Sequence, residues 1–565
     1  MRTLRTGCLW VLVVGLMSLL TGVQAASLVW RATPPANWDT TSPTNWSVGY
    51  TSVFTNYTEG DSVTFDSENY PSSCGAIMIQ AGGVHPASVT VTGQRAPVGW
   101  TFSGGDIMGS CAVTQNWGNR DMTFIGGDAN WNYNFTGGTT LTNSTGMMLK
   151  YQPGVGGGVD THWFGTTNIT LCSPNSGFRF VTVDSGDHLS NNFVYNGGRW
   201  LAPENGGILD GTIALPGSMY FDGTSKGTST VTSVTNTFIL TTHAAAFRHM
   251  SAIVGNGFSI DGPITSGAGG PYDLTLQEAG DNYAWYVFLG DRGGTNPPMD
   301  VRNLTLTTAT VNQGTIQINA DERTYFTKMR DNGGTMVLAS ATSVRFARSN
   351  TIELNFPMEV QPANKGFQLD DTLNVNSNGV LKARGNFGRS TGIYSTDYSN
   401  PMTINVKTGG IMEVSSGVFC PGPVNVLTGG VLRGSGTLLN NLMVTNGATL
   451  IPGLAGTIGT LSVSNLTLYP TAQLNFDVAT ILGQKTNDVI QVSSNLVLDG
   501  VLNIAASGRL LDGAYRIMTY SGTLTDNGLV VGTVPDGYRF RVVAGGGVVD
   551  AICTIMSPGL LIQLR

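Results

Sequence analysis

The chain carries little charge. Charged residues make up 12% of its 565 residues, about half of the ~25% found in typical globular domains. Lysine and arginine total 29 against 36 aspartates and glutamates, which gives a net charge of −7, and the basic residues are scattered. Nucleic acid binding needs a clustered Lys/Arg surface that faces the phosphates. The composition therefore excludes nucleic acid as an expected partner.

Long hydrophobic runs are also lacking. The longest apolar stretch, Leu9–Leu20, is about twelve residues, whereas a membrane-spanning helix needs roughly 20. Arg2 and Arg5 precede this stretch and the small-x-small site Val23-Gln24-Ala25 follows it, which is the arrangement of an export signal cleaved after Ala25. We expect no transmembrane segment in the mature chain, and a secreted, extracellular or outer cell-surface location.

Cysteine is sparse. Five cysteines follow the cleavage site, far apart and without a Cys-x-x-Cys pair: Cys74, Cys111, Cys172, Cys420 and Cys553. This spacing disfavours a metal knuckle and allows at most two disulfides. A Cys74–Cys111 bridge is one pairing that the sequence leaves open.

Short runs of alternating apolar residues are abundant, joined by Gly- or Asn-centred turns. In the last third of the chain, Val406, Val426, Val444 and Val463 precede such turns at spacings of 20, 18 and 19 residues. Strands that recur at this period are typical of a solenoid, in which each repeat buries its apolar face by stacking on its neighbours. The sequence therefore predicts an all-β solenoid.

Composition and regularity divide the chain into five expected parts. A Trp- and Tyr-rich segment follows the signal, and the strand signals become most regular after residue 300. The ends of a solenoid expose unpaired strand edges and need covering. The expected parts are a signal peptide (1–25), an N-terminal β cap (26–110), irregular coils with longer loops (111–300), regular coils (301–485) and a C-terminal capping β region (486–565).

Two segments predict other local structures. Leu240–Ser251 has a helical composition and predicts one short helix. Asp499-Gly500 lies between two apolar-alternating runs, Leu496–Leu498 and Val501–Ile504, which predicts a β-hairpin.

Four sequence segments, most of them near the two ends of the chain, carry a family resemblance. They are Trp38-Asp-Thr-Thr with Asn45-Trp46, Gly60-Asp-Ser-Val-Thr-Phe-Asp66, Phe135-Thr-Gly-Gly-Thr-Thr140 and the segment from Asn487 to Val549. They resemble secreted bacterial proteins with autotransporter-associated β-strand repeats. The resemblance implies an autotransporter passenger-like, right-handed parallel β-helix on or outside the cell, and it implies no active residues. The chain ends at Arg565 without the strands of an outer-membrane barrel, so we expect export by the general pathway and a further route.

Enzymes built on β-helices place carboxylates and a basic residue on one solvent face of successive coils, where neighbouring environments separate the carboxylate pKa values. A solvated turn is the alternative interpretation of each such residue, because turns favour aspartate. The catalytic candidates are Asp281, Asp291, Asp321, Glu322 and Arg323.

Aromatic and paired acidic residues provide binding candidates. Trp163, Trp200, Trp285 and Tyr286 would stack on sugar rings, or else pack the loops against the solenoid. The adjacent Asp370-Asp371 pair is a candidate Ca²⁺ site, because Ca²⁺ takes oxygen ligands. No other cofactor is expected.

The leading hypothesis is a non-catalytic extracellular or cell-surface β-helix protein that acts in adhesion, matrix or surface structure. Its expected partners are extracellular polysaccharide or cell-surface components. A polysaccharide lyase or glycoside hydrolase, or a carbohydrate-binding protein without turnover, is the alternative, since one fold hosts several functions.

Overall fold

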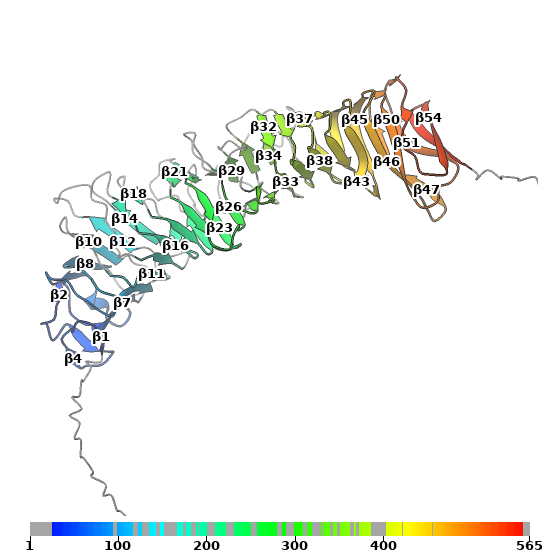
Figure 1. The fold of residues 1–565 in the computed structure, drawn as a ribbon. Coiled ribbons are helices and arrows are strands. Elements are labelled where there is room, and N and C mark those ends of the chain that lie inside the picture. Colours follow the sequence, from blue (N-terminus) through cyan, green and yellow to red (C-terminus); the bar gives the residue numbers. More distant parts are fainter. Residues whose placement is uncertain are drawn as a thin grey trace, which may run out of the picture.

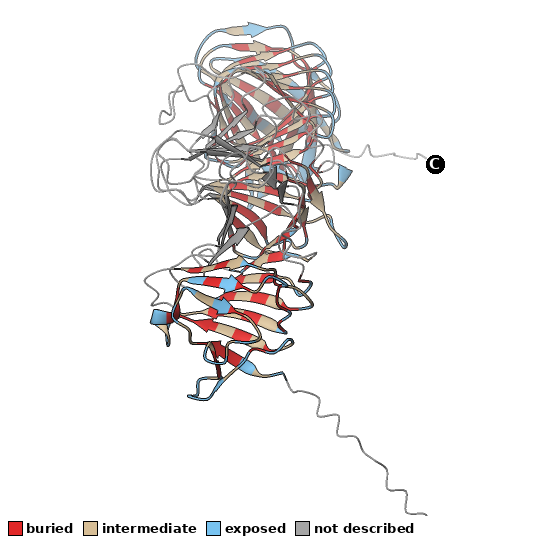
Figure 2. Ribbon diagram, turned by 90° about the vertical axis from the view of Figure 1, so that its left-hand side faces the viewer, coloured by how far each residue is buried: buried red, intermediate tan, exposed pale blue. Residues whose placement is uncertain are grey.

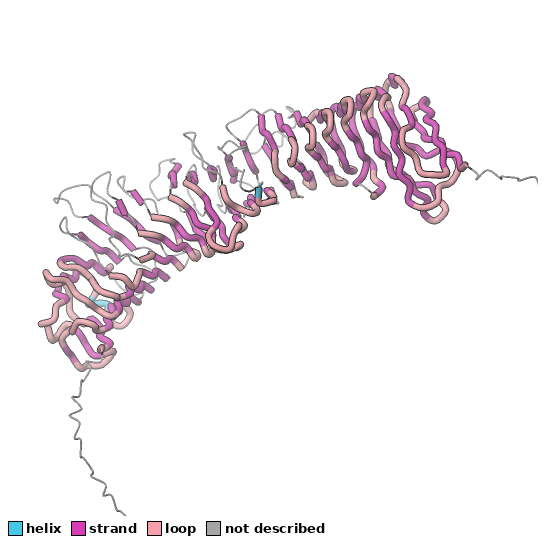
Figure 3. The backbone as a smooth tube through the Cα atoms, viewed as in Figure 1, coloured by secondary structure: helices cyan, strands magenta, loops and turns pink. Residues whose placement is uncertain are grey.

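The described part of the chain is all-β in the computed structural model, and its strands form an elongated, curved stack (Figure 1). Figure 3 shows strands crossing the stack along its length, with helical structure confined in the described residues to short pieces such as η1 (Pro71–Ser73). The structure describes residues 25–556 except 94–98, 117–121, 127–134, 143–146, 152–166, 173–176, 182–187, 190, 201–207, 210, 222–230, 235, 250–256, 261, 279–284, 290–298, 309–313, 319–328, 330, 340–342, 347–350, 362–365, 369–371, 386–402, 421 and 455.

The first sheet lies in the N-terminal half. It starts with three antiparallel strands and continues with parallel neighbours. In spatial order its strands are β4 (Phe54–Thr55), β3 (Trp46–Val48), β1 (Ser27–Trp30), β5 (Ser62–Asp66), β7 (Ser88–Thr92), β9 (Ala112–Asn116), β11 (Thr139–Thr142), β13 (Ile169–Leu171), β16 (Phe193–Tyr195), β19 (Ile213–Leu215), β22 (Phe238–Leu240) and β25 (Ile264–Ser266).

The second sheet runs along the whole stack, and its strands pair in parallel from β2 to β53. Two further strands, β44 (Thr457–Ile458) and β47 (Gln484–Asn487), fold back on it as antiparallel hairpins. The parallel strands are β2 (Ala36–Trp38), β6 (Ala76–Ile79), β8 (Trp100–Gly104), β10 (Met122–Gly126), β12 (Met147–Tyr151), β14 (Gly177–Val181), β17 (Arg199–Trp200), β20 (Ser218–Phe221), β23 (Ala245–His249), β26 (Leu274–Glu278), β28 (Leu304–Thr308), β30 (Met336–Leu338), β33 (Pro357–Val360), β36 (Val380–Ala383), β38 (Ile411–Val414), β41 (Val431–Gly434), β43 (Thr449–Leu454), β46 (Gln473–Ile481), β50 (Val501–Ser507) and β53 (Val530–Val531).

The remaining strands cover the other sides of the stack. A third sheet contains β21 (Val231–Val234), β24 (Gly257–Ile260), β27 (Trp285–Leu289), β29 (Gly314–Ile318), β31 (Ser343–Phe346) and β34 (Gly366–Gln368), and β15 (His188–Leu189) pairs with β18 (Ile208–Leu209). The fourth sheet contains β32 (Thr351–Leu354), β35 (Thr372–Val375), β37 (Thr403–Val406), β39 (Phe419–Cys420), β40 (Val424–Val426), β42 (Thr437–Val444), β45 (Thr460–Leu468), β48 (Val489–Val492), β49 (Leu496–Leu498), β51 (Gly513–Tyr520), β52 (Leu524–Asp526), β54 (Tyr538–Gly545) and β55 (Val548–Ile555).

The chain visits these sheets in turn. β30, β31 and β32 belong to the second, third and fourth sheets, and β33, β34 and β35 repeat that order. We call one such pass a rung. Each strand pairs in parallel with its equivalent in the next rung, as β30 does with β33 and β32 with β35. This arrangement of parallel sheets is consistent with a β-helix-like fold.

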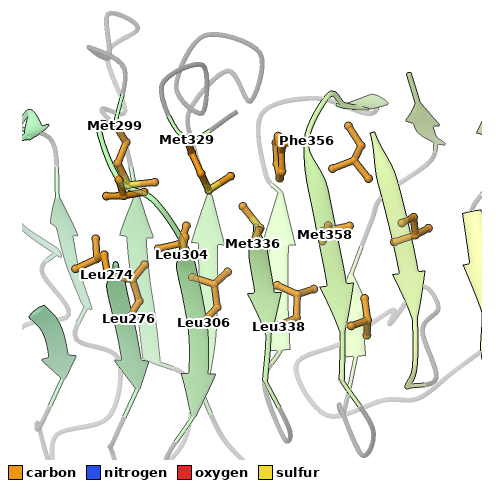
Figure 4. Packing of buried hydrophobic residues seen from close by; sticks show 14 of the residues in the cluster. Leu274, Leu276, Met299, Leu304, Leu306, Met329, Met336, Leu338, Phe356 and Met358 are labelled. Carbon is orange, nitrogen blue, oxygen red and sulfur yellow. The ribbon is translucent and has the colours of Figure 1, made fainter. Parts of the chain in front are cut away.

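The core fills the interior between the sheets. Buried and partly exposed residues alternate along the strands (Figure 2), because successive side chains of a strand point to opposite faces. Leu274, Leu304, Met336 and Met358 pair from strand to strand in the second sheet, and all four are buried (Figure 4). Since each fully buried side chain of this size stabilises the fold by about 1.5–3 kcal/mol, such columns hold neighbouring rungs together.

The predicted valine column is confirmed for three of its four members. Val406 pairs with Val426, and Val426 pairs with Val444. Val463 does not continue the column, because Val444 pairs instead with Leu468. Val463 lies nearer the start of the same long strand, β45, and pairs with Leu438. Val463 and Leu468 both face the interior, and the spacing in the sequence cannot tell which of them continues the column.

Two local predictions are wrong. The segment predicted as a helix, Leu240–Ser251, contains strand β23, whose Phe247 is fully buried and pairs with Met219 and Leu276. The turn at Asp499-Gly500 is not a hairpin. It carries the chain from β49 in the fourth sheet to β50 in the second, and both strands pair in parallel with other rungs. Corner turns and hairpin turns use the same residue types, so sequence did not separate them.

Both ends of the stack depart from the parallel pattern. At the N-terminal end, β3 and β4 pack antiparallel beside β1 over a core that contains Trp30, Trp38 and Trp46. At the C-terminal end, β54 and β55 form a true hairpin with a two-residue loop, Gly546-Gly547, in which φ is positive at both positions (+61° and +85°). That is the conformation of a type I′ turn.

The Cys74–Cys111 bridge that the sequence left open is not formed. Both cysteines are free and buried. Burial raises the pKa of each thiol to about 12, which keeps them protonated at neutral pH, so they are unreactive core residues.

Candidate functional site

The structure describes only part of the set of site residues predicted from sequence. Trp285 and Tyr286 are the first two residues of β27 in the third sheet, whereas Trp200 is the last residue of β17 in the second sheet. The structure therefore places Trp200 on a different sheet from the other two. The other candidates lie outside the described residues: Asp281, Asp291, Asp321, Glu322, Arg323, Trp163, Asp370, Asp371 and the signal before Ala25.

A histidine–aspartate pair lies at a corner of the stack. His243 Nδ1 is 2.9 Å from Asp273 Oδ2, and the Tyr272 ring packs edge-on against the imidazole. The other carboxylate oxygen of Asp273 accepts hydrogen bonds from the Asn303 backbone N–H (3.2 Å) and from its side-chain amide (2.8 Å). Within the described residues no serine or cysteine hydrogen-bonds to this pair. It therefore links successive rungs and lacks the third member of a nucleophilic triad.

Asp488 is a buried carboxylate that braces two hairpins. It has no exposed surface, and its two oxygens accept hydrogen bonds from the backbone N–H groups of Gly459 (2.7 Å) and Asp477 (2.8 Å). Gly459 follows the β43–β44 hairpin and Asp477 lies in β46, so one side chain ties both segments to the start of β48. Burial raises the pKa of Asp488 to about 7, and the nearby Asp477 carboxylate acts in the same direction, while the two N–H donors oppose the shift.

This raised pKa predicts a pH-dependent stability. Protonation of Asp488 is favoured in the folded state. Its contribution to the free energy of unfolding is therefore fully present below the unfolded pKa of about 3.9 and is lost as pH rises toward 7. We expect the free energy of unfolding to fall by about 2 kcal/mol between pH 5 and pH 8, measured by urea titration at each pH with far-UV circular dichroism. Asp488→Asn should be less stable than the parent, because one N–H loses its acceptor, and should show a much smaller fall.

Asp526→Asn is the control, since it changes an exposed carboxylate and should keep the parent's pH dependence. An equal pH-dependent fall in Asp488→Asn and in the parent would show that another group is responsible.

Asparagine side chains line the outer face of the fourth sheet in a ladder. Asn425 donates a hydrogen bond to Asn405, Asn405 donates to Asn374 and Asn374 donates to Glu353, with distances of 2.8–2.9 Å. Their backbone positions pair strand to strand, so the stacking of rungs brings like residues together. The amides are used by one another, and the ladder is a structural element.

Further along the same sheet the outer surface is hollowed. A groove of about 420 Å³ crosses β42, β45, β48 and the end of β51. Its lining residues are Thr437, Leu438, Leu439, Ser462, Val463, Ser464, Gln491, Val492, Ser493, Thr519 and Ser521. The side chains of Leu438, Val463 and Val492 are buried in the core, so the exposed lining carries hydroxyl and amide groups, with Leu439 as its exposed aliphatic side chain. No lining side chain is ionisable, so the groove can bind by hydrogen bonding and contact but offers no acid or base.

Sequence reasoning missed both the groove and Asp488. The serines and threonines of the groove have the ordinary composition of an outward-facing strand surface, and only strand pairing shows that they align. Asp488 has only a weak signal in the sequence: it immediately precedes the apolar-alternating run Val489–Val492, which forms a strand.

The described part of the chain contains neither a cluster of metal ligands nor a membrane-spanning helix. Among the described residues, no group of three or more histidine, cysteine, aspartate or glutamate side chains could hold a metal ion. In the same part of the chain, no helix has the length and apolarity needed to cross a bilayer.

Comparison with known proteins finds a partial similarity to an autotransporter adhesin. Over 117 residues, 20% of this chain, the sequence is 40% identical to the adhesin BmaC autotransporter of Brucella suis biovar 1 (strain 1330). The match covers 3% of that protein's length, so the similarity concerns a small part of a much longer relative. No protein-family model matches the chain.

Proposed function

We propose that this chain is a non-catalytic, adhesin-like protein of the cell surface or the extracellular space, built as a right-handed parallel β-helix with β caps at both ends. The similarity to an autotransporter adhesin carries the proposal. The rung-by-rung parallel pairing supports the β-helix, and the antiparallel strands at the two ends support the caps.

The architecture suits adhesion. An elongated stack of rungs presents a long outer surface (Figure 1) in a chain with few charged residues. Extended repeat proteins use such surfaces to bind partners along their length. The described polar constellations are structural: the His243–Asp273 pair and the asparagine ladder join rungs, and Asp488 braces hairpins. A binding role needs only such a surface, whereas catalysis needs groups positioned at reacting atoms.

Attachment assays test this function. We expect deletion of the gene in the producing bacterium to reduce attachment to a surface that the parent colonises by at least threefold, with recovery on complementation. Antibody to the chain should label intact cells. Unlabelled cells, or attachment unchanged by deletion, would contradict the proposal.

A second measurement tests the absence of catalysis. Purified full chain incubated with plant and algal polysaccharides should release no reducing ends and no unsaturated products above a heat-denatured control. Turnover in this assay would show that the chain is an enzyme.

A further inference from the structure

The groove on the fourth sheet is built from two rows of side chains, and the first row is in strict register. Thr437 pairs with Ser462, Ser462 with Gln491 and Gln491 with Thr519, which forms the first row. The second row lies two residues further along the chain from each member of the first row. Its members are Leu439 in β42, Ser464 in β45, and Ser493 and Ser521, which directly follow β48 and β51. Since neighbouring strands are about 4.8 Å apart, four strands give a groove roughly 14 Å long that runs along the stack.

A bulge shapes one end of the groove. In β42 the register shifts after Leu438. Leu438 pairs with Val463 and Asn441 pairs with Asn465, so β42 advances by three residues where β45 advances by two. Bulges bend a strand and redirect side chains, and they recur beside binding sites. Here the extra residue leaves Leu439, the first member of the second row, 50% exposed. The groove therefore has an apolar contact at one end and polar walls beyond it.

The polar side chains of the groove have few partners within the protein. Ser462 and Gln491 approach each other at 3.4 Å, which is a weak contact. In the described part of the chain, no other side-chain hydrogen bond involves the lining hydroxyls of Thr437, Ser464, Ser493, Thr519 and Ser521. Each hydroxyl can both donate and accept. Unlike the amides of the asparagine ladder, these groups remain available to a ligand.

The chemistry of the lining excludes several ligand classes. Phosphate polymers and acidic glycans need Lys or Arg, and Ca²⁺ needs carboxylate or carbonyl oxygens, but no lining side chain carries a charge. A peptide cannot add to the sheet here, because β45 is paired on both sides, with β42 and with β48. An uncharged ligand with many hydroxyl groups and some apolar C–H surface matches what remains.

We infer that this groove binds a neutral saccharide chain of two or three sugar units, which lies along the stack. This inference rests on the proposed adhesin-like function and gives it a ligand class. The hydroxyls of both rows exchange hydrogen bonds with sugar hydroxyls, and Leu439 contacts the apolar face of a terminal ring. The strand spacing of about 4.8 Å is close to the length of one sugar unit along a chain, so successive rungs meet successive sugars. A volume of about 420 Å³ lies within the 300–1,000 Å³ range of small-molecule sites.

Affinity electrophoresis tests the inference. The full chain is run through native gels that contain dextran, hydroxyethylcellulose or galactomannan, with polygalacturonate as the anionic comparison. We expect retardation in at least one neutral gel. Ser493→Trp, which fills the middle of the groove from an exposed position, should weaken the binding at least tenfold.

Thr525→Trp is the matched control. Thr525 is an exposed residue of β52 in the same sheet and does not line the groove, so this variant should be retarded like the parent. Circular dichroism of both variants shows whether the sheet is intact, and the double variant Ser464→Ala/Ser493→Ala repeats the test without added bulk. No retardation in any neutral gel, retardation confined to polygalacturonate, or an equal effect of Ser493→Trp and Thr525→Trp would overturn the inference.

The attachment assay separates the two proposals. If no neutral gel retards the chain while deletion abolishes attachment, the groove inference fails and the adhesin-like function stands. If the chain binds a neutral gel through the groove but deletion leaves attachment unchanged, the saccharide site stands and the adhesin-like function fails.

Discussion

Phe65→Ala should destabilise the N-terminal end of the stack by about 3–5 kcal/mol, the usual cost of removing a buried phenylalanine ring. Phe65 is fully buried in β5, and its ring centroid lies 5.1–5.7 Å from those of five other aromatic residues. These neighbours are Trp30, Trp38, Trp46, Trp100 and Phe102. Most contacts are edge-to-face, the geometry that aromatic pairs favour. The alanine variant loses the buried ring with these contacts and leaves a cavity, which places the expected loss at the upper end of this range.

Tryptophan fluorescence is the measurement for this variant. All ten tryptophans lie at or before Trp285, so fluorescence reports on the first half of the chain, while circular dichroism reports on all of it. We expect the fluorescence transition in urea to move to lower concentration. Val53→Ala removes a side chain that is 60% exposed and should change the stability by no more than about 0.5 kcal/mol. A similar shift in both variants would show that the aromatic core is not the source of stability at this end.

Gly410→Ala should destabilise the regular part of the stack by about 3 kcal/mol. Gly410 lies at the corner between β37 and β38, and a Cβ atom there would be 2.1 Å from the carbonyl oxygen of Val375 in the neighbouring rung. The same carbonyl accepts a hydrogen bond from the Lys407 N–H (2.8 Å). The backbone must move to relieve this overlap, and the movement disrupts the hydrogen bonds between the two rungs.

Urea unfolding followed by far-UV circular dichroism checks this expectation, because no tryptophan lies in this half of the chain. The control is Gly417→Asn at the next corner, where φ is +79° and no atom lies within 4 Å of the added Cβ. Asparagine tolerates this left-handed conformation, so the loss should be about 1 kcal/mol or less. If Gly410→Ala is as stable as this control, close packing at the corners does not limit the fold.

The strand content and the parallel stacking could be predicted from the sequence because both depend on local alternation and on its period. Val406, Val426 and Val444 align as expected, since equal spacing in sequence becomes equal position in the rung. The prediction for Val463 is wrong because β45 is longer than β40 and β42, the strands before it in this column, and contains two inward-facing segments. A period alone cannot tell which segment continues a column.

The two wrong local predictions have the same physical cause: contacts with strands distant in the sequence decide the local structure. Leu240–Ser251 was predicted from intrinsic helix propensity, which differs by less than about 1 kcal/mol between ordinary residues. Burial of Phe247 between Met219 and Leu276 outweighs that preference. The Asp499-Gly500 turn was assigned correctly as a turn, but its role as a corner depends on partners 28 or more residues away, as in the pairing of Asn475 with Asn503.

The candidate groove could not be predicted, because its surface is assembled from four rungs. Thr437 and Thr519 are 82 residues apart in the sequence, and neither is unusual in its own strand. The catalytic candidates rest on the pattern of carboxylates and a basic residue found in enzymes built on β-helices. They remain predictions, because they lie outside the described residues.

The asparagine ladder implies that the length of this molecule is adjustable in discrete steps. Asn405 and Asn425 occupy the same position in consecutive rungs, so loss or duplication of the twenty residues between them returns an asparagine to the same neighbour. Each such event moves the two ends by about one strand spacing, ~4.8 Å, and leaves their chemistry intact. Evolution can therefore tune how far this protein reaches without redesigning its ends.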